Sequence, residues 1–316
     1  MRAAERAERR AIERTQRPLL APYALLGGAQ LAVGAAAIFA RFALTGAGPL
    51  AVSASRLTIA AAVLLLVSVV RRERSKPLPG QSRGLALAGV ALALHFAGWI
   101  ASLQYTTVAV STLLVATAPV WTAIYDAAFR RRPPSVQTLC AFAGGAAGLA
   151  LVAGFNATPP PIPGRPLLGA ALALTGSLAM AIYLLLVREV RGSLGTRTIV
   201  TRTYTWAAIV LVIAAGLAHQ PAPALSDGRA WGGILGMALV SQLLGHTALN
   251  AALRWFSPSG VAFSTLIEPV SAAVLAFFIF GERLAPPAIA GGVVLLAAIA
   301  VVLREERAGV SLDSVM

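Results

Sequence analysis

Ten apolar runs, separated by short polar or Pro/Gly-rich segments, follow one another along the chain. They cover residues 20–44, 50–70, 84–104, 107–128, 136–155, 166–187, 199–218, 230–253, 260–280 and 286–303. Each is close to the roughly 20 residues that a helix needs to cross a bilayer. Backbone amides must be paired inside hydrocarbon, and the runs lack the strict alternation of barrel strands. The pattern therefore predicts an all-α integral membrane protein with ten transmembrane helices.

Composition supports this interpretation. The 316 residues are 58% hydrophobic and 12% charged, with a mean hydropathy of +0.77. A soluble domain carries roughly 25% charged residues, so this chain has too little polar surface for a water-soluble globule. The first run is longer than the apolar core of a signal peptide, about 7–15 residues, and is preceded by a long basic segment. We therefore expect it to be a first span and not a removable peptide.

The positive charges predict the orientation. Of the 26 Lys and Arg residues, 20 lie in segments on the same side as the N-terminus, and three lie within the runs: Arg41, Arg56 and Arg202. The three in loops of the other side are Arg165, Arg229 and Arg283. This asymmetry predicts that both termini are cytoplasmic. The richness in Ala, Gly and Arg, with Lys76 as the one lysine, suggests a GC-rich bacterial genome and so a bacterial plasma membrane. The asymmetry also accounts for the net charge of +14 without nucleic acid as a partner. The basic N-terminal tail is expected to be solvated or to contact anionic lipid.

The chain contains an internal repeat. Pro119 aligns with Pro269 at an offset of 150, and at the same offset Ser-Leu-Gln-Tyr at 102–105 matches Ala-Leu-Arg-Trp at 252–255. Residues 52–58 resemble 198–204 at an offset of 146, which pairs Arg56 with Arg202. Further pairs are Gly34 with Gly176, and Gly144-Gly145 with Gly291-Gly292.

Because each half holds five spans, an odd number, the second half must enter the membrane from the opposite side, as in many secondary transporters. The expected organisation is a cytoplasmic tail (1–18), a first five-helix repeat (19–155), an outer linker (156–165), a second repeat (166–304) and a C-terminal tail (305–316). The spacings Gly144-x-x-x-Gly148 and Gly232-x-x-x-Gly236 predict close helix contacts, with a monomer or a homodimer left open.

Several motifs resemble the EamA-type members of the drug/metabolite transporter superfamily. The similar stretches are 257–270, Phe280-Gly281-Glu282-Arg283-Leu284 and Gly291-Gly292, with Tyr105 to Ala109 and Ala118-Pro119-Val120 in the first half. The chain departs from the pattern at Arg131-Arg132, where the family has Gly-Glu, and at Val33-Gly34, where it often has Trp-Gly. The resemblance implies an exporter-like fold in which helices 1–4 and 6–9 surround a central cavity. Relatives move amino acids, nucleobases, polyamines or cationic drugs.

Candidate site residues fall within the spans. Pro119 and Pro269 each remove one helical hydrogen bond, at matching positions of the two halves. They predict bending points beside a transport site, or kinks that serve packing alone. Glu268 is a carboxyl group inside an apolar run, so it must face a wet cavity, be protonated or pair with a cation. It is a candidate for substrate or proton handling, with a structural ion pair as the alternative. Asp126 is expected to be a solvated interfacial group.

The remaining candidates are histidines, their neighbours and two arginines. His95 with Trp99, and His246 with Asn250, are each one helical turn apart, and they predict either cavity lining or cross-helix hydrogen bonds. Arg56 and Arg202 are expected to be structural, by snorkelling or binding carbonyl groups, or to face an anion.

The function expected is a secondary active exporter of a small metabolite that works by alternating access. A channel or scramblase-type facilitator is the main alternative. A membrane-embedded enzyme is disfavoured because the sequence lacks metal motifs and a P-loop. The expected partners are a small-molecule substrate, protons and membrane lipids, with no cofactor and no metal.

Overall fold

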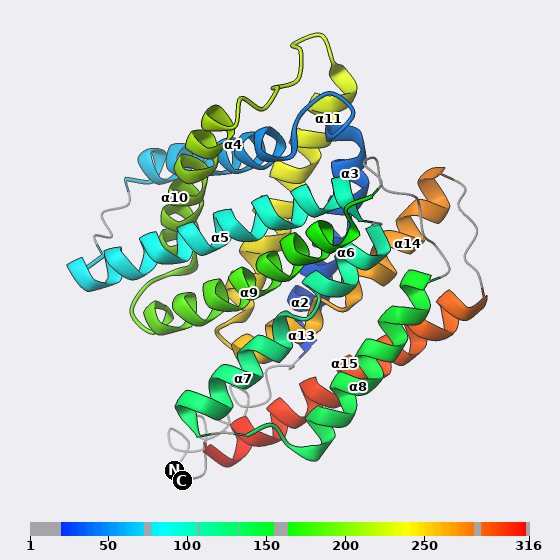
Figure 1. Ribbon diagram of the computed structural model, residues 1–316. Coiled ribbons are helices and arrows are strands. Elements are labelled where there is room, and N and C mark those ends of the chain that lie inside the picture. The colour runs from blue at the N-terminus through cyan, green and yellow to red at the C-terminus, as the bar shows by residue number, and fades with distance from the viewer. Residues whose placement is uncertain are drawn as a thin grey trace, which may run out of the picture.

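The computed structural model describes residues 20–72, 77–106, 108–131, 133–154, 164–280 and 286–313. Within these residues every regular element is helical (Figure 1). The first half contains α2 (Leu20–Gly34), α3 (Ala36–Ala43), α4 (Pro49–Val70), α5 (Pro79–Tyr105), α6 (Val108–Val115), α7 (Ala118–Arg130) and α8 (Val136–Gly154). The second half contains α9 (Pro166–Arg191), α10 (Thr196–Leu217), α11 (Gly228–Gly236), the π-helix η1 (Met237–His246), α12 (Thr247–Ala252), α13 (Pro258–Ser264), α14 (Ile267–Phe280) and α15 (Pro286–Asp313).

Six helical segments of the described chain are long and apolar enough to cross a membrane. They are Ala21–Ala43, Pro49–Val70, Pro79–Tyr105, Pro166–Arg191, Thr196–Leu217 and Gly228–Ala252. Their outward faces carry large apolar side chains; on α4, Leu66, Val69 and Val70 are 64–73% exposed. Soluble monomers rarely expose contiguous apolar patches of this kind, whereas a bilayer covers them. The surface is that of a protein embedded in lipid.

Two of the predicted spans are interrupted. The run at 107–128 is split between α6 and α7 at Ala116 and Thr117, and the run at 260–280 is split between α13 and α14 at Thr265 and Leu266. At both breaks a threonine hydroxyl donates to the carbonyl oxygen three residues earlier, at 2.7 Å, which satisfies an acceptor at the helix end. The sequence predicted a bend inside one helix at each proline. The structure instead has an interruption just before Pro119 and just before Pro269, which lie in the first turns of α7 and α14.

Helices α4 and α10 are equivalent elements of the two halves, and both are 22 residues long. Each begins after an extended glycine, Gly48 (φ −72°, ψ 154°) or Gly195 (φ −70°, ψ 151°). Each is followed by a left-handed residue, Arg72 with φ 50° or His219 with φ 49°. Because both ends agree, the offset between these helices is 147.

This register corrects the pairing of two arginines. The sequence motif aligned Arg56 with Arg202 at an offset of 146. At the structural offset of 147, Arg56 corresponds to Thr203, and both of these side chains are fully buried. Arg202 is exposed on the surface of α10. One residue of shift turns a helix by about 100°, so the two arginines lie on different faces.

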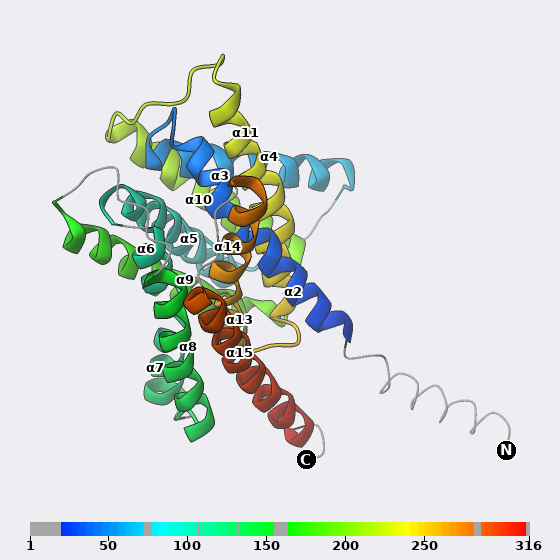
Figure 2. The ribbon, with the colours of Figure 1, turned by 90° about the vertical axis from the view of Figure 1, so that its right-hand side faces the viewer.

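Glycines set the closest helix contacts. Helix α5 crosses α9 where a Cβ at Gly98 would lie 2.6 Å from the carbonyl oxygen of Leu172. Helices α8 and α15 lie side by side in Figures 1 and 2, apart from the α4–α10 pair. In each predicted Gly-x-x-x-Gly spacing only the second glycine is at such a contact. Gly148 and Gly236 face a neighbouring helix, whereas a Cβ at Gly144 or Gly232 would meet no atom within 4 Å.

Candidate functional site

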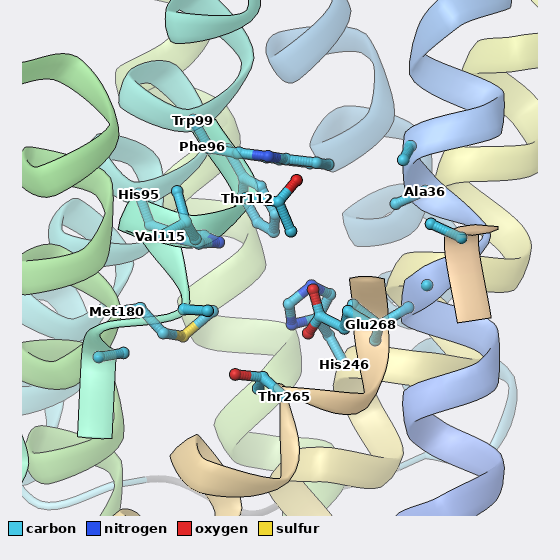
Figure 3. A pocket seen from close by; sticks show the side chains of 16 residues that line it. Ala36, His95, Phe96, Trp99, Thr112, Val115, Met180, His246, Thr265 and Glu268 are labelled. Carbon is cyan, nitrogen blue, oxygen red and sulfur yellow. The ribbon is translucent and has the colours of Figure 1, made fainter. Parts of the chain in front are cut away.

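A small cavity lies between the two halves, next to both helix breaks (Figure 3). Its volume is about 50 Å³, which is room for a few water molecules but not for a drug-sized ligand. Its walls come from α2, α3, α5, α6, α7, α9, η1 and α14, with residues of both breaks. They are Val33, Gly34, Ala36, Ala37, His95, Phe96, Trp99, Thr112, Val115, Ala116, Ala118, Met180, His246, Thr265, Glu268 and Ala272.

Glu268 is the one acidic residue among these lining side chains. It lies in the first turn of α14, and its backbone amide donates to the carbonyl oxygen of Thr265 at 2.9 Å, which closes the tight turn of the break. Within the described part of the chain we find no hydrogen bond or ion pair to its carboxyl group. The interruption of the helix therefore holds a carboxyl group in the cavity without a direct protein partner.

Aromatic rings form much of the wall around this carboxyl group. Trp99 and His95 are stacked, with centroids 6.5 Å apart, and the ring of His246 meets the ring of Phe96 edge-on at 5.2 Å. His95 Nδ1 lies 2.9 Å from the carbonyl oxygen of Gly176, which fixes the ring against α9. Since a carbonyl oxygen accepts, Nδ1 carries the proton, and in the neutral ring Nε2 is the unprotonated nitrogen. Aromatic and imidazole groups suit a site that binds a small organic solute.

The π-helix η1 places two polar residues inside the protein. His246 ends it and lines the cavity, and Gln242 lies one turn earlier, fully buried. The Oε1 atom of Gln242 accepts a hydrogen bond of 2.7 Å from Arg56 of α4. The guanidinium of Arg56 lies 4.0 Å from the centroid of the Phe96 ring, and Phe96 lines the cavity although Arg56 does not.

Some of the predicted site residues line the cavity and others do not. His95, Trp99, His246 and Glu268 line the cavity, at the positions given above. Pro119 is buried at the start of α7 but does not line the cavity, although Ala118 beside it does. The side chain of Pro269 lies outside the described residues, as does the whole of Glu282. Sequence analysis missed Phe96, Met180 and Gln242; of these only Gln242, a polar residue in an apolar run, carries a signal that could have marked it.

Asn250 has a structural environment in this fold. Its Oδ1 accepts a hydrogen bond of 2.8 Å from the hydroxyl of Tyr183, and its Nδ2 donates to the carbonyl oxygen of His246 at 2.8 Å. Asn250 is 1% exposed and does not line the cavity. It ties α9 to the turn that carries His246, so its link to the site is indirect.

An ionic cluster joins the ends of α7 and α9. Asp126 lies 3.6 Å from Arg130 and 3.7 Å from Arg188, and Arg130 pairs with Glu189. The hydroxyl of Ser259, which begins the second half's broken span, lies 3.5 Å from Asp126. Sequence predicted a solvated interfacial group at Asp126. In the structure its side chain is 19% exposed and also forms ion pairs, which the sequence did not predict.

Residues 21–154 and 167–304 match the EamA-like transporter family, one match for each half. The chain belongs to this family. As an EamA-like protein it is a multi-pass membrane protein and a transporter. A protein of Archaeoglobus fulgidus named "Uncharacterized transporter" is 26% identical over 214 residues, which are 67% of this chain and 73% of the relative. Both names are those of transporters.

A solved crystal structure of a protein aligns with this EamA-like chain with a TM-score of 0.71. The alignment covers 89% of this chain and 96% of the other, at 15% sequence identity. At that identity the likeness establishes a common fold and nothing about the substrate. Among the described residues, α8 and α15 contribute no side chain to the cavity, and neither do α4 and α10, which the family resemblance placed around it.

Proposed function

We propose that this EamA-like protein exports a small metabolite across a bacterial plasma membrane by alternating access. In this proposal ten spans form two inverted halves, with both termini in the cytoplasm. The six long apolar segments are six of these spans. The interrupted pairs α6–α7 and α13–α14, together with α8 and α15, provide the other four.

One observation carries the proposal: the cavity lies where the broken helices of both halves meet, and it holds a carboxyl group that has no direct partner among the described residues. A volume of about 50 Å³ is too small for a metabolite, so binding requires helices to move apart. The breaks at Thr117 and Thr265 are the natural points for such movement, because backbone hydrogen bonds are already interrupted there. Glu268 lies next to one break and moves with α14.

Flux in proteoliposomes tests transport. Protein-dependent uptake of a labelled solute, from a panel of amino acids, nucleobases and organic cations, is the expected result. A carrier also shows counterflow: unlabelled solute inside the vesicle accelerates entry of the labelled one. Flux without counterflow would favour a channel-like facilitator, and flux equal to that of empty liposomes across the panel would contradict the proposal.

Glu268→Gln is the informative variant, since it removes the charge and preserves the shape. We expect it to abolish pH-dependent transport. The titratable and charged groups around it are His95, His246 and Arg56. Glu189→Gln is the matched control, because Glu189 is an exposed carboxylate that does not line the cavity. Unchanged pH dependence in Glu268→Gln would leave Glu268 a structural role only.

Single-cysteine labelling tests the topology. Cys140 is the only cysteine, so Cys140→Ser gives a cysteine-free background. Ser193 follows α9 and Ser226 precedes α11, and both are exposed. In intact cells an impermeant maleimide is expected to label Ser226→Cys and not Ser193→Cys. The reverse pattern would overturn the proposed orientation.

A further inference from the structure

Arg56 is a fully buried cation whose hydrogen bonds do not satisfy it. Its Nη2 donates to Gln242, but neither Nε nor Nη1 has a hydrogen-bond partner in the described chain. The face of Phe96 receives the guanidinium at 4.0 Å, which is favourable but does not neutralise it. An arginine cannot lose its proton in a protein. A buried positive charge of this kind needs a negative charge nearby.

Glu268 is the candidate for this negative charge. It is the acidic residue of the cavity lining, and Phe96, whose ring carries the Arg56 guanidinium, belongs to the same lining. The described ion pairs of Asp126 and Glu189 lie at the ends of α7 and α9, and Asp227 caps α11. Phe96 is in contact with both features, because Arg56 lies over its ring and its side chain lines the cavity that holds Glu268. The two charges belong to different halves of the chain.

We propose that Arg56 is the resident counter-charge of Glu268, and that this couple restricts the substrate to solutes without net charge. The inference rests on the proposed transport function and specifies the chemistry of the same cavity. With Glu268 ionised and the two imidazoles neutral, the site carries no net charge. A bound cation would neutralise Glu268 and leave Arg56 uncompensated in a medium of low dielectric constant. A bound anion is accommodated only when Glu268 takes up a proton, whereas a cation has no equivalent route.

A thermal double-mutant cycle tests the couple without any ligand. Arg56→Gln and Glu268→Gln each leave one buried charge unpaired, and we expect each to lower the midpoint of unfolding by roughly 5 °C or more. The double variant removes both charges and is expected to recover at least half of that loss. If the losses of midpoint in the two single variants simply add in the double variant, the proposed couple is wrong. If the single variants do not fold, recovery of a monodisperse double variant supports it, and failure to recover contradicts it.

Arg202→Gln is the matched control for this cycle. Arg202 has the same charge in a membrane span but is exposed on α10. Combined with Glu268→Gln, it is expected to show additive effects. Coupling of Glu268 to Arg202 as strong as its coupling to Arg56 would mean that the cycle reports overall charge and not this pair, and would also overturn the assignment.

Three solutes of equal length test the charge class: butyramide, butylammonium and butyrate. They are measured by proteoliposome uptake at pH 8, where an ordinary imidazole of pKa about 6.5 is neutral. The wild type is expected to take up butyramide at least tenfold faster than butylammonium, and Arg56→Gln to narrow or reverse this ratio. Wild-type uptake of butylammonium that equals or exceeds that of butyramide overturns the charge-class assignment. If the double-mutant cycle shows coupling but no solute shows protein-dependent flux, the transport function is contradicted and the Arg56–Glu268 couple is not. The two failures are therefore distinguishable.

Discussion

The contact between α8 and α15 gives a sharp test of the packing, because it distinguishes two glycines one turn apart. A Cβ at Gly148 would lie 2.7 Å from the carbonyl oxygen of Gly291 and 3.0 Å from the amide nitrogen of Leu295. Separations below 3.0 Å do not occur for real Cβ atoms, and both partners are backbone, so the two helices must separate. A Cβ at Gly144 would meet nothing within 4 Å.

The magnitude follows from two opposing terms. Overpacking of a tight contact costs about 1–3 kcal/mol, while Gly→Ala within a helix stabilises it by roughly 0.5–1 kcal/mol. Gly148→Ala is therefore expected to be destabilised by about 0.5–2 kcal/mol, and Gly144→Ala to be unchanged or slightly stabilised. At about 2–4 °C per kcal/mol, the two midpoints of thermal unfolding should differ by roughly 5 °C.

The assay is thermal unfolding of both variants, purified in the same detergent or nanodisc and compared with the wild type. Both substitutions add one methyl group to the same helix, so the change in helix propensity largely cancels. Equal midpoints for Gly148→Ala and Gly144→Ala would refute the close approach of α8 and α15. Gly144→Ala as the less stable variant would place the other face of α8 against α15.

Three further outcomes are expected. Gly98→Ala should destabilise the protein by about 1–2 kcal/mol, because the new Cβ would lie 2.6 Å from the carbonyl oxygen of Leu172. Thermal unfolding measures this loss, and an unchanged midpoint would contradict the α5–α9 crossing. Asp126→Asn should lower stability by less than about 1 kcal/mol, and the loss should shrink in high salt, since its partners are partly exposed; a salt-independent loss would argue against an ionic cause. Pro119→Ala should slow transport turnover more than it weakens substrate binding, because it allows α6 and α7 to join; equal turnover would exclude bending there.

The sequence predicts the helical frame well because a bilayer leaves few alternatives. Backbone pairing in hydrocarbon demands helices, and the apolar runs mark where they lie. Pro269 marks a bend near residue 269, but nothing marks a full break at Thr265 and Leu266, since threonine and leucine are ordinary residues of an apolar helix. The π-helical segment from Met237 to His246 is equally hidden, because an apolar segment that is buried on one side and lipid-covered on the other shows little periodicity.

The site shows the same contrast between residues that stand out and residues that do not. Glu268 and His246 are polar groups in apolar runs, so composition alone marks them as candidates. Phe96 carries no such signal, although it lines the cavity and contacts Arg56. Asn250 is as conspicuous as His246, yet it bonds to Tyr183 instead of lining the cavity. Sequence identifies which side chains need a polar environment, but only the packing decides whether a cavity or a neighbouring helix provides it.

The two halves place residues at equivalent positions around the cavity, but the residue types at these positions differ. At the offset of 150, Glu268 corresponds to Ala118 and His246 corresponds to Phe96, and all four line the cavity. The geometry is thus repeated while the ionisable groups at these positions occur only in the second half. Two carboxylates in so small a space would repel one another, and none would leave the buried Arg56 without a counter-charge. A single carboxyl group beside one helix break lets the two halves supply equivalent motions around one site.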